Sequence, residues 1–398
     1  MDRIFHRAAL ARQMAQQLLR PGVLDEGLRS GLFISGIRRT GKTTFLQADL
    51  LPALEEAGAL VIYVDLWSNT QANPAALVHA AIRRALHELQ SPAGSVVDRL
   101  KKLRNAEVAV AGFKFGFKIE SIGTDAGPTL AEAFAQVVDQ ARGDIVLIVD
   151  EVQHAITSDE GNQMLLALKA ARDAINQRPD TPGHFIFVGT GSHRALVSEL
   201  TARRNQAFAG ATSIAYPVLD ADYVAHLLER LRAEGLVALP SAAVATQAFR
   251  TLGARPEELL RALRELRGLL PPGAEPDAFL PVIAGTLRST AADVEIMKVE
   301  QLGALAMAVF ARVAGTSGDA KGLFSADSLA GYARTIGRDV RADEVQAVLN
   351  ELMAANIVMR RGHGLYGLTD PFVQEIWHER NALMRPPTAA GGSGSPPA

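Results

Sequence analysis

The chain has 398 residues, 48% of them hydrophobic, which is enough for two or three domains with cores of their own. A formal charge of −2 argues against binding polyanions through bulk charge, so any contact with nucleic acid has to come from a local basic patch. Cysteine is absent, which excludes disulfides, thiolate metal sites and a cysteine nucleophile.

The first 22 residues carry charge throughout and lack an apolar core. They predict an amphipathic helix that ends near Pro21 and not a signal peptide. No later apolar run reaches the length of a membrane span. A cytoplasmic protein without a membrane partner is therefore expected.

Four short runs that are apolar throughout alternate with helical patterns: GLFISG (31–36), ALVIYVDLW (59–67), DIVLIVDE (144–151) and HFIFVGTG (184–191). The helices expected between them lie at 74–90, 129–142 and 161–177. Strands that are buried on both faces lack the alternation of half-solvated strands, so these runs predict the centre of a parallel sheet. Residues 1–217 therefore predict an α/β domain built from right-handed crossovers.

The segment EVAVAGFKFGFKIES (107–121) departs from this pattern because phenylalanines alternate with lysines. The alternation predicts a half-buried strand or hairpin inserted between two helices. Such a pattern is also able to stack on nucleic-acid bases. A ribbon packed on its own domain or on a protein partner is the favoured interpretation.

Helices dominate the rest of the chain. Apolar positions three to four residues apart predict a helical domain with its linker at 218–297. Residues 298–385 predict three more helices and a glycine-tipped hairpin, MRRGHGLY, which is the outline of a winged helix. Proline, glycine and small polar residues at 386–398 predict a disordered tail.

The stretch GIRRTGKTTF (36–45) joins the first predicted strand to a predicted helix and has the pattern G-x-x-x-x-G-K-[ST]. Glycines let such a loop curl so that its amides point at an anion, and the helix N-terminus adds partial positive charge. Lys42 has the reach to bridge the β- and γ-phosphates, and the Thr43 hydroxyl is placed to ligate Mg²⁺. The predicted nucleotide-binding residues are Gly36, Arg38, Arg39, Thr40, Gly41, Lys42, Thr43 and Thr44.

Two carboxylates, Asp150 and Glu151, stand at the end of the strand IVLIVD. Open parallel sheets bind ligands at the carboxyl ends of their strands, so both side chains are expected beside the phosphate loop. Asp150 is predicted to hold Mg²⁺ through its water shell. Glu151 is predicted to orient and deprotonate the attacking water.

The next predicted strand ends in FVGTGSHR, where Thr190 and Ser192 offer hydroxyls to a γ-phosphate or to the attacking water. One of them is a candidate sensor of hydrolysis. Both are equally readable as turn residues that cap the following helix. His154 has no second ligand at a suitable spacing, so no metal site is predicted there.

The segments FISGIRRTGKTTFL, LIVDEVQH and FIFVGTGSHRALVSEL resemble the archaeal-type AAA+ P-loop ATPases, which are related to origin-recognition-like and STAND NTPases. The likeness covers most of the chain. It implies a parallel sheet in the order 5-1-4-3-2, a helical lid, a C-terminal winged helix and ATP as the nucleotide. The motifs themselves do not distinguish ATP from GTP.

The resemblance also assigns residues outside these motifs. Arg255 in LGARPEELLRAL stands where relatives carry a second sensor that approaches the γ-phosphate from the lid, although it is also readable as a solvated arginine before Pro256. Many relatives place an arginine that completes a neighbour's site just before the last strand. This chain has Ala211 there, with Arg203 and Arg204 as candidate substitutes upstream, so stimulated turnover and oligomerisation stay open.

The predicted winged helix has an unfavourable charge pattern for DNA on its third helix, which carries Asp343, Glu344 and Glu351. The wing is better suited, because Arg360 and Arg361 lie at its tip. DNA contact through the wing is one alternative. Docking within the chain or on a protein partner is the favoured one.

The sequence thus predicts an α/β P-loop NTPase of the AAA+ class that binds Mg²⁺ and ATP, hydrolyses ATP to ADP and phosphate, and acts as a nucleotide-driven conformational switch. Two alternatives stay open: an ATP-dependent DNA-binding factor, and a nucleotide-gated protein scaffold with little hydrolysis. The predicted catalytic residues are Lys42, Glu151, Thr190, Ser192 and Arg255, and the predicted metal ligands are Thr43 and Asp150.

Overall fold

The structure is a computed structural model that describes residues 4–69, 71–91, 113–202, 206–362 and 364–384. It divides into two compact units, Met1–Gly285 and Thr286–Ala398. The division falls inside helix α12 (Pro276–Gln301), as does the domain boundary predicted at residue 297. The boundary predicted at residue 217 stays a prediction, and the tail predicted at 386–398 lies outside the described residues.

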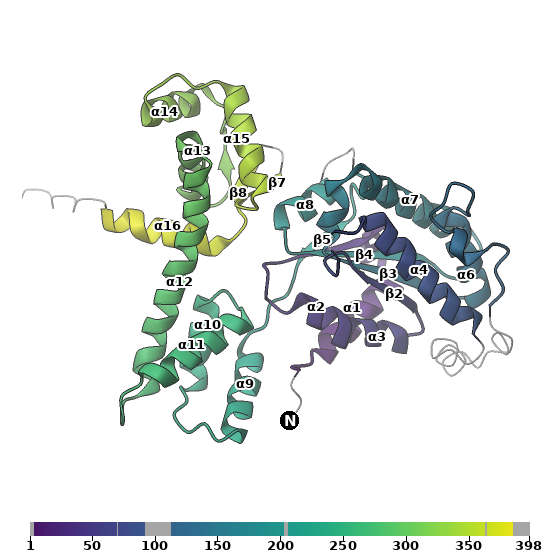
Figure 1. Cartoon of the computed structure of the whole chain (residues 1–398), viewed down its shortest axis with the longest axis horizontal. Coiled ribbons are helices and arrows are strands. Elements are labelled where there is room, and N and C mark those ends of the chain that lie inside the picture. The colour runs from purple at the N-terminus through teal and green to yellow at the C-terminus, as the bar shows by residue number, and fades with distance from the viewer. Residues whose placement is uncertain (1–3, 70, 92–112, 203–205, 363, 385–398) are drawn as a thin grey trace, which may run out of the picture. The chain divides into compact units, whose positions relative to one another are not determined.

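A five-stranded parallel sheet forms the centre of the first unit (Figure 1). The strand order 5-1-4-3-2 is confirmed, and all strands run parallel. In that spatial order the strands are β5 (Thr212–Ala215), β1 (Leu32–Ser35), β4 (Phe185–Gly191), β3 (Ile145–Asp150) and β2 (Leu60–Asp65). Every residue of β3 and β4 is buried, as their uninterrupted apolar sequences predict.

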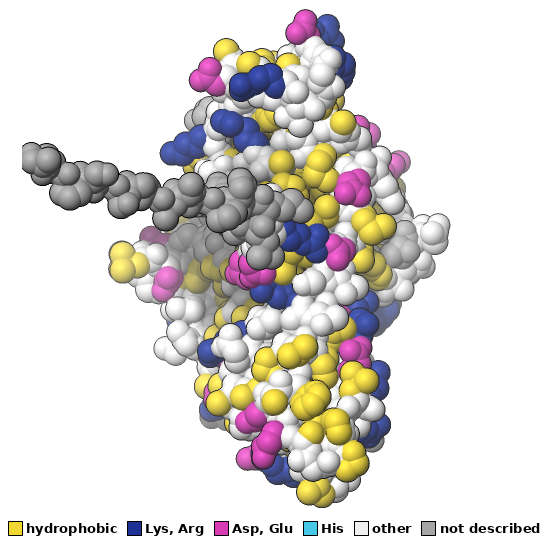
Figure 2. All heavy atoms as spheres, turned by 90° about the vertical axis from the view of Figure 1, so that its left-hand side faces the viewer, with side chains coloured by type: hydrophobic (Ala, Val, Ile, Leu, Met, Phe, Trp, Pro, Cys, Tyr) yellow, Lys and Arg dark blue, Asp and Glu magenta, His cyan; other side chains and the backbone are white. Residues whose placement is uncertain are grey.

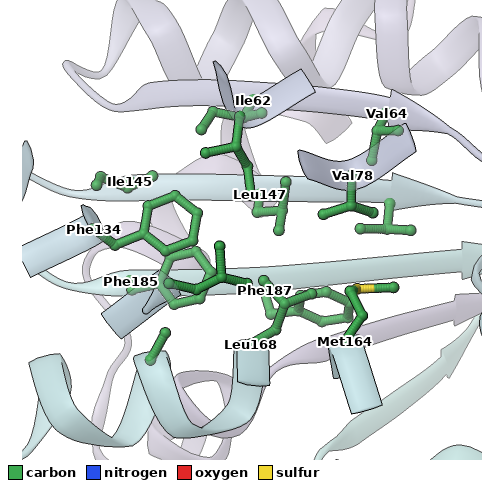
Figure 3. Packing of buried hydrophobic residues seen from close by; sticks show 14 of the residues in the cluster. Ile62, Val64, Val78, Phe134, Ile145, Leu147, Met164, Leu168, Phe185 and Phe187 are labelled. Atoms are coloured by element: carbon green, nitrogen blue, oxygen red, sulfur yellow. The ribbon is translucent and has the colours of Figure 1, made fainter. Parts of the chain in front are cut away.

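Helices cover both faces of this sheet (Figure 1). Alternate residues of β3 enter two different cores, since successive side chains of a strand point to opposite faces. Ile145 and Leu147 pack with α4 (Pro74–Gln90), α6 (Leu130–Ala141) and α7 (Asp159–Asn176), as Figure 3 shows. Ile148 packs in the other core with α1 (Ala8–Leu19), α2 (Lys42–Phe45) and α3 (Leu51–Glu56).

The strand predicted at 107–121 is wrong for its described part. Residues 107–112 lie outside the described residues. Residues 113–118 form no strand, and the backbone bends at Gly116 and Phe117 before a 3-10 turn at Ile119–Ser121. A side chain of α6 takes the place of a partner strand: Gln140 accepts from the Lys114 amide at 2.9 Å and donates to its carbonyl at 2.7 Å. The alternating sequence pattern therefore predicts which side chains are buried, but the backbone of Lys114 is hydrogen-bonded to Gln140 and not to a neighbouring strand.

The burial of this segment does alternate. Phe113 and Ile119 are buried, and Lys114 is exposed. Phe115 and Phe117 pack against the core of the unit and stack on each other with ring centroids 5.5 Å apart. These contacts agree with a ribbon packed on its own domain.

Three helices of the first unit follow the sheet and precede α12: α9 (Ala221–Ala233), α10 (Ala242–Thr251) and α11 (Pro256–Leu269). Ser241 accepts a hydrogen bond from the amide of Val244 and so caps α10. They lie within the helical lid and linker that the sequence predicts at 218–297, whose bounds stay a prediction.

The second unit is a winged helix with a core of its own. Helices α13 (Ala304–Ala314), α14 (Ala326–Ile336) and α15 (Ala342–Ala354) precede the hairpin of β7 (Val358–Gly362) and β8 (Leu365–Leu368), and β6 (Ala320–Lys321) adds a third antiparallel strand. Trp377 of α16 (Pro371–Met384) packs edge-on against Phe310, with ring centroids 5.1 Å apart. Over the described ranges, no helix has both the length and the apolar character that crossing a bilayer requires.

Candidate nucleotide-binding site

The phosphate loop curls between β1 and α2. Two of its residues have left-handed backbones, Arg39 with φ 65° and Gly41 with φ 90°. Thr40 is buried, and its hydroxyl donates to the carbonyl of Ile37 at 2.8 Å. Glycine at 36 is required by space, because a Cβ there would lie 2.9 Å from the Cβ of Tyr216.

Lys42 reaches into the curl of this loop. Its ammonium group donates to the carbonyls of Gly36 at 2.8 Å and Ile37 at 2.7 Å. Burial lowers the pKa of Lys42 to about 8, although the nearby Glu151 and Asp150 carboxylates act in the opposite direction. A buried cation beside the loop amides is a site for an anion.

Asp150 lies at the carboxyl end of β3 and is buried. Its Oδ2 accepts from the Thr43 hydroxyl at 2.7 Å and from the Tyr63 hydroxyl at 3.2 Å, and its Oδ1 accepts from the Thr190 hydroxyl. The predicted metal ligands Thr43 and Asp150 are thus in direct contact. Carboxylate and hydroxyl oxygens are the donors that Mg²⁺ prefers, so this set of residues fits that ion.

Glu151 follows Asp150 with a left-handed backbone, φ 55°. Its Oε2 accepts from the amide of Ser192 at 3.1 Å, from the Ser192 hydroxyl at 2.7 Å and from the side-chain amide of Gln153. Burial by itself would raise the pKa of Glu151, but the hydrogen bonds from Gln153 and Ser192 and the charge of Lys42 hold that pKa below its usual value. The carboxylate is therefore ionised at neutral pH, as a general base requires.

The two candidate sensors contact different carboxylates. Thr190 bonds Asp150, while Ser192 bonds Glu151 and also accepts from the Arg38 guanidinium at 3.2 Å. Ser192 thereby links the phosphate loop to Glu151. At the start of helix α8 (Arg194–Ala202), the amide of Leu196 donates to Nδ1 of His193 at 3.3 Å.

A cavity of about 500 Å³ opens over the phosphate loop. Two residues of the lid, Pro256 and Glu257, contribute to its wall, and Glu257 lies 3.3 Å from the Arg39 guanidinium. Arg255 directly precedes them as the N-cap of α11 but does not line this cavity. The lining residues are Arg38, Arg39, Gly41, Lys42, Thr43, Thr44, Trp67, Glu151, Pro256 and Glu257.

Sequence reasoning missed several residues of the site. Trp67 follows β2 and stacks under the Arg38 guanidinium, 4.4 Å from its ring centroid, and contacts the ring of His154 edge-on at 5.0 Å. Tyr216 follows β5 and donates to the carbonyl of Gly41 at 3.2 Å. Tyr63 lies within β2. The only signal available in the sequence was the position of Trp67 at the end of the predicted run 59–67.

The remaining predicted residues lie elsewhere. Ala211 is buried just before β5, whereas Arg203 and Arg204 lie outside the described residues. In the wing, Arg361 lies 3.2 Å from Asp319 and Arg360 donates to the carbonyl of Gly362.

The winged-helix unit, at the top of Figure 2, shows basic and acidic side chains interspersed. On α15, Arg341 lies 2.9 Å from Asp343, so an acidic and a basic side chain are paired at the start of the third helix. DNA contact through Arg360 and Arg361 stays a prediction.

A parallel sheet of this order, a phosphate loop over its carboxyl edge and the strand-end pair Asp150 and Glu151 define an ATP-binding ATPase of the AAA+ type. The model of a family described as "ATPase domain predominantly from Archaea" matches residues 17–262, and the chain belongs to this family. A search of curated proteins found no match.

Several solved structures are similar to this chain. The Walker-type ATPase Paby2304 of Pyrococcus abyssi is 17% identical, with 94% of this chain and 96% of that chain covered and a TM-score of 0.53. The ORC2 protein of Aeropyrum pernix in its ADP form is 14% identical, with 96% and 97% covered and a TM-score of 0.49. At 17% identity the likeness to Paby2304 concerns the fold alone.

Proposed function

We propose that this protein binds ATP together with Mg²⁺, hydrolyses it to ADP and phosphate, and uses the nucleotide as a conformational switch. The observation that carries the proposal is the meeting of Thr43, Asp150 and Glu151 at one edge of the sheet, beside Lys42 of the phosphate loop. These groups come from two separate segments of the chain, the phosphate loop with the start of α2 and the end of β3. Lys42, Thr43 and Glu151 line one cavity, and Asp150 is bonded to Thr43 beside it.

Each residue has a distinct task in this proposal. The loop amides and Lys42 bind the β- and γ-phosphates, and Thr43 with Asp150 would hold Mg²⁺. That ion, when bound, neutralises charge on the phosphates. Glu151 orients the attacking water and accepts its proton.

The switch is supported by lid residues in the wall of the cavity. Arg39 lies on the phosphate loop, and its ion pair with Glu257 reaches α11 of the lid. A bound triphosphate competes with Glu257 for Arg39, so gain and loss of the γ-phosphate change the contacts of the lid. Thr190, Ser192 and Arg255 are the proposed sensors of that change.

Removal of Mg²⁺ tests the proposal. Phosphate release from ATP by the purified protein is expected with Mg²⁺ and is expected to fall to background in excess EDTA, because Thr43 and Asp150 are placed to hold the ion. Turnover is measured by a coupled phosphate assay, and binding by calorimetry under the same conditions. Absence of ATP binding with Mg²⁺ present contradicts the proposal, whereas binding without turnover favours the nucleotide-gated scaffold.

The pKa of Lys42 predicts a pH dependence of binding. Burial lowers this pKa to about 8 in the folded protein, from 10.5 in an exposed lysine. Between these values the unfolded chain holds more protons, so this group makes the nucleotide-free protein more stable as the pH rises through that window. Phosphates favour the ammonium form, so ATP binding near pH 8 is expected to take up protons and to weaken at higher pH.

Calorimetry in two buffers of different ionisation enthalpy measures this uptake. Lys42→Arg is the matched control, because arginine stays charged throughout the window. An apparent binding enthalpy that is the same in both buffers for the unmodified protein contradicts the assignment.

The two alternative functions have weaker support. Little hydrolysis, as in a scaffold, is favoured by the buried Ala211 at a position where many relatives carry an arginine. DNA binding would use the wing, where Arg361 is paired with Asp319. The turnover assay separates the first of these alternatives from the proposed ATPase.

A further inference from the structure

Gln153 is a buried polar residue at the edge of the site, two positions after Glu151. It lies in a short 3-10 helix (Val152–Thr157) and is 3% exposed. Its side-chain nitrogen donates to Oε2 of Glu151, whereas its Oε1 is buried and has no hydrogen-bond partner among the described residues. A buried acceptor without a partner destabilises a fold, so this arrangement calls for an explanation from function.

The orientation of the amide follows from the charge of Glu151. An ionised carboxylate only accepts hydrogen bonds, so Gln153 has to present its NH₂ group to it. The opposite orientation would set two acceptors against each other. A charge-assisted hydrogen bond is among the stronger kinds, and it offsets the unpaired oxygen on the far side of the amide.

The end of β4 is shaped to admit this side chain. A Cβ on Gly191 would lie 2.1 Å from Oε1 of Gln153 and 2.6 Å from a methyl group of Val197. Gly191 is not among the glycines with a left-handed backbone, so space and not conformation requires a glycine here. Glu151, Gln153 and Gly191 therefore form one packed unit across β3 and β4.

The two oxygens of Glu151 differ in their surroundings. The hydrogen bonds that it accepts from described residues, one from Gln153 and two from Ser192, all end on Oε2. Three donors on one oxygen prevent the carboxylate from rotating. Oε1 is therefore the oxygen that can accept a proton. Because Glu151 lines the cavity, that proton can come from a molecule bound there.

We propose that Gln153 is a positioning residue for hydrolysis: together with Ser192 it holds Oε2 of Glu151, so that Oε1 takes the proton of the attacking water. The water oxygen forms a bond to the γ-phosphorus, the bond from that phosphorus to the bridging oxygen breaks, and ADP leaves. Gln153 touches neither water nor nucleotide. This inference rests on the proposed function, in which Glu151 is the base.

Several charged groups interact with Glu151 itself or with its charged neighbours Lys42 and Asp65, and all of them are common to every variant compared below. They come from the phosphate loop, α2 and the ends of β2 and β3, and from the residues that follow β3 and β4. They are Arg38, Lys42, Asp65, Asp150, His154 and Arg194.

Gln153→Met keeps the shape of the side chain and removes the donor. The kcat for ATP hydrolysis is expected to fall about tenfold to a hundredfold, the loss typical of a misplaced catalytic group, with the affinity for ATP unchanged. The melting temperature is expected to stay the same or rise, since a buried unpaired oxygen is removed. Gln163→Met, at an exposed position of α7, is the matched control.

Gly191→Ala provides a second variant that leaves Gln153 in the sequence but takes its space. It is expected to lower kcat in the same way as Gln153→Met. In a background that carries both Gln153→Ala and Val197→Ala, which removes the clashing oxygen and the clashing methyl group, the further effect of Gly191→Ala is expected to be much smaller. Additive losses contradict the proposed link between the two residues.

The split between kcat and affinity decides between the possible outcomes. An unchanged kcat in Gln153→Met, with ATP binding as in the unmodified protein, overturns the positioning role of Gln153. An unmodified protein that binds ATP without hydrolysing it overturns the proposed ATPase and, with it, the base that Gln153 is proposed to hold.

Discussion

Replacement of Glu151 by glutamine is expected to lower the kcat for ATP hydrolysis by about 10²–10⁴-fold, the contribution typical of a positioned general base. The amide has nearly the same size as the carboxylate but cannot take a proton from water. Affinity for ATP is expected to be unchanged, because Glu151 is assigned to the attacking water and Lys42 to the phosphates. Phosphate release measures the first quantity and calorimetry the second.

The left-handed backbone of Glu151, with φ 55°, makes the choice of substitution important. Glutamine resembles glutamate in its backbone preferences, so the variant tests chemistry and not folding. Glu160→Gln, at an exposed position of α7, changes the net charge by the same amount at a place away from the site, and it is the control. Hydrolysis that persists in Glu151→Gln at the rate of this control would refute the assignment of Glu151 as base.

Lys42→Ala is expected to weaken ATP binding by about 2–5 kcal/mol, roughly 30-fold to several thousandfold in Kd, as for truncation of one partner in a buried charge pair. The physical reason is that the buried ammonium group lies within the curled loop, where the phosphates are proposed to bind. Hydrolysis is expected to be lost with binding. Calorimetry with ATP and Mg²⁺ checks the affinity.

Stability separates this effect from unfolding. Burial lowers the pKa of Lys42, which means that its charged form is less stable in the folded protein than in water. The melting temperature of Lys42→Ala is therefore expected not to fall much. Lys169→Ala removes a partly exposed lysine of α7 that pairs with Asp173, and it serves as the control. Equal ATP affinity in both variants is the outcome that rules out the assigned role of Lys42.

Local features of this protein are already decided in its sequence. The strand β3 is apolar from Ile145 to Val149, so burial on both faces follows from composition. Its carboxyl end has to carry Asp150 and Glu151 to the ligand edge of a parallel sheet. The phosphate loop is equally local, because glycine spacing and the following helix lie within ten residues. These patterns predict the class of protein and the main residues of the site.

Contacts between distant segments were decided only by the tertiary structure. Gln153 has room beside Glu151 because the distant residue Gly191, at the end of β4, has no side chain. Trp67 contacts Arg38 because β2 ends at the same edge of the sheet as the phosphate loop. The segment at 113–118 pairs with a glutamine of α6 and not with a strand. An alternating pattern specifies which face of a segment is buried, and a buried polar residue specifies that a hydrogen-bond partner is needed. Which group becomes the partner depends on where separate parts of the chain meet in space.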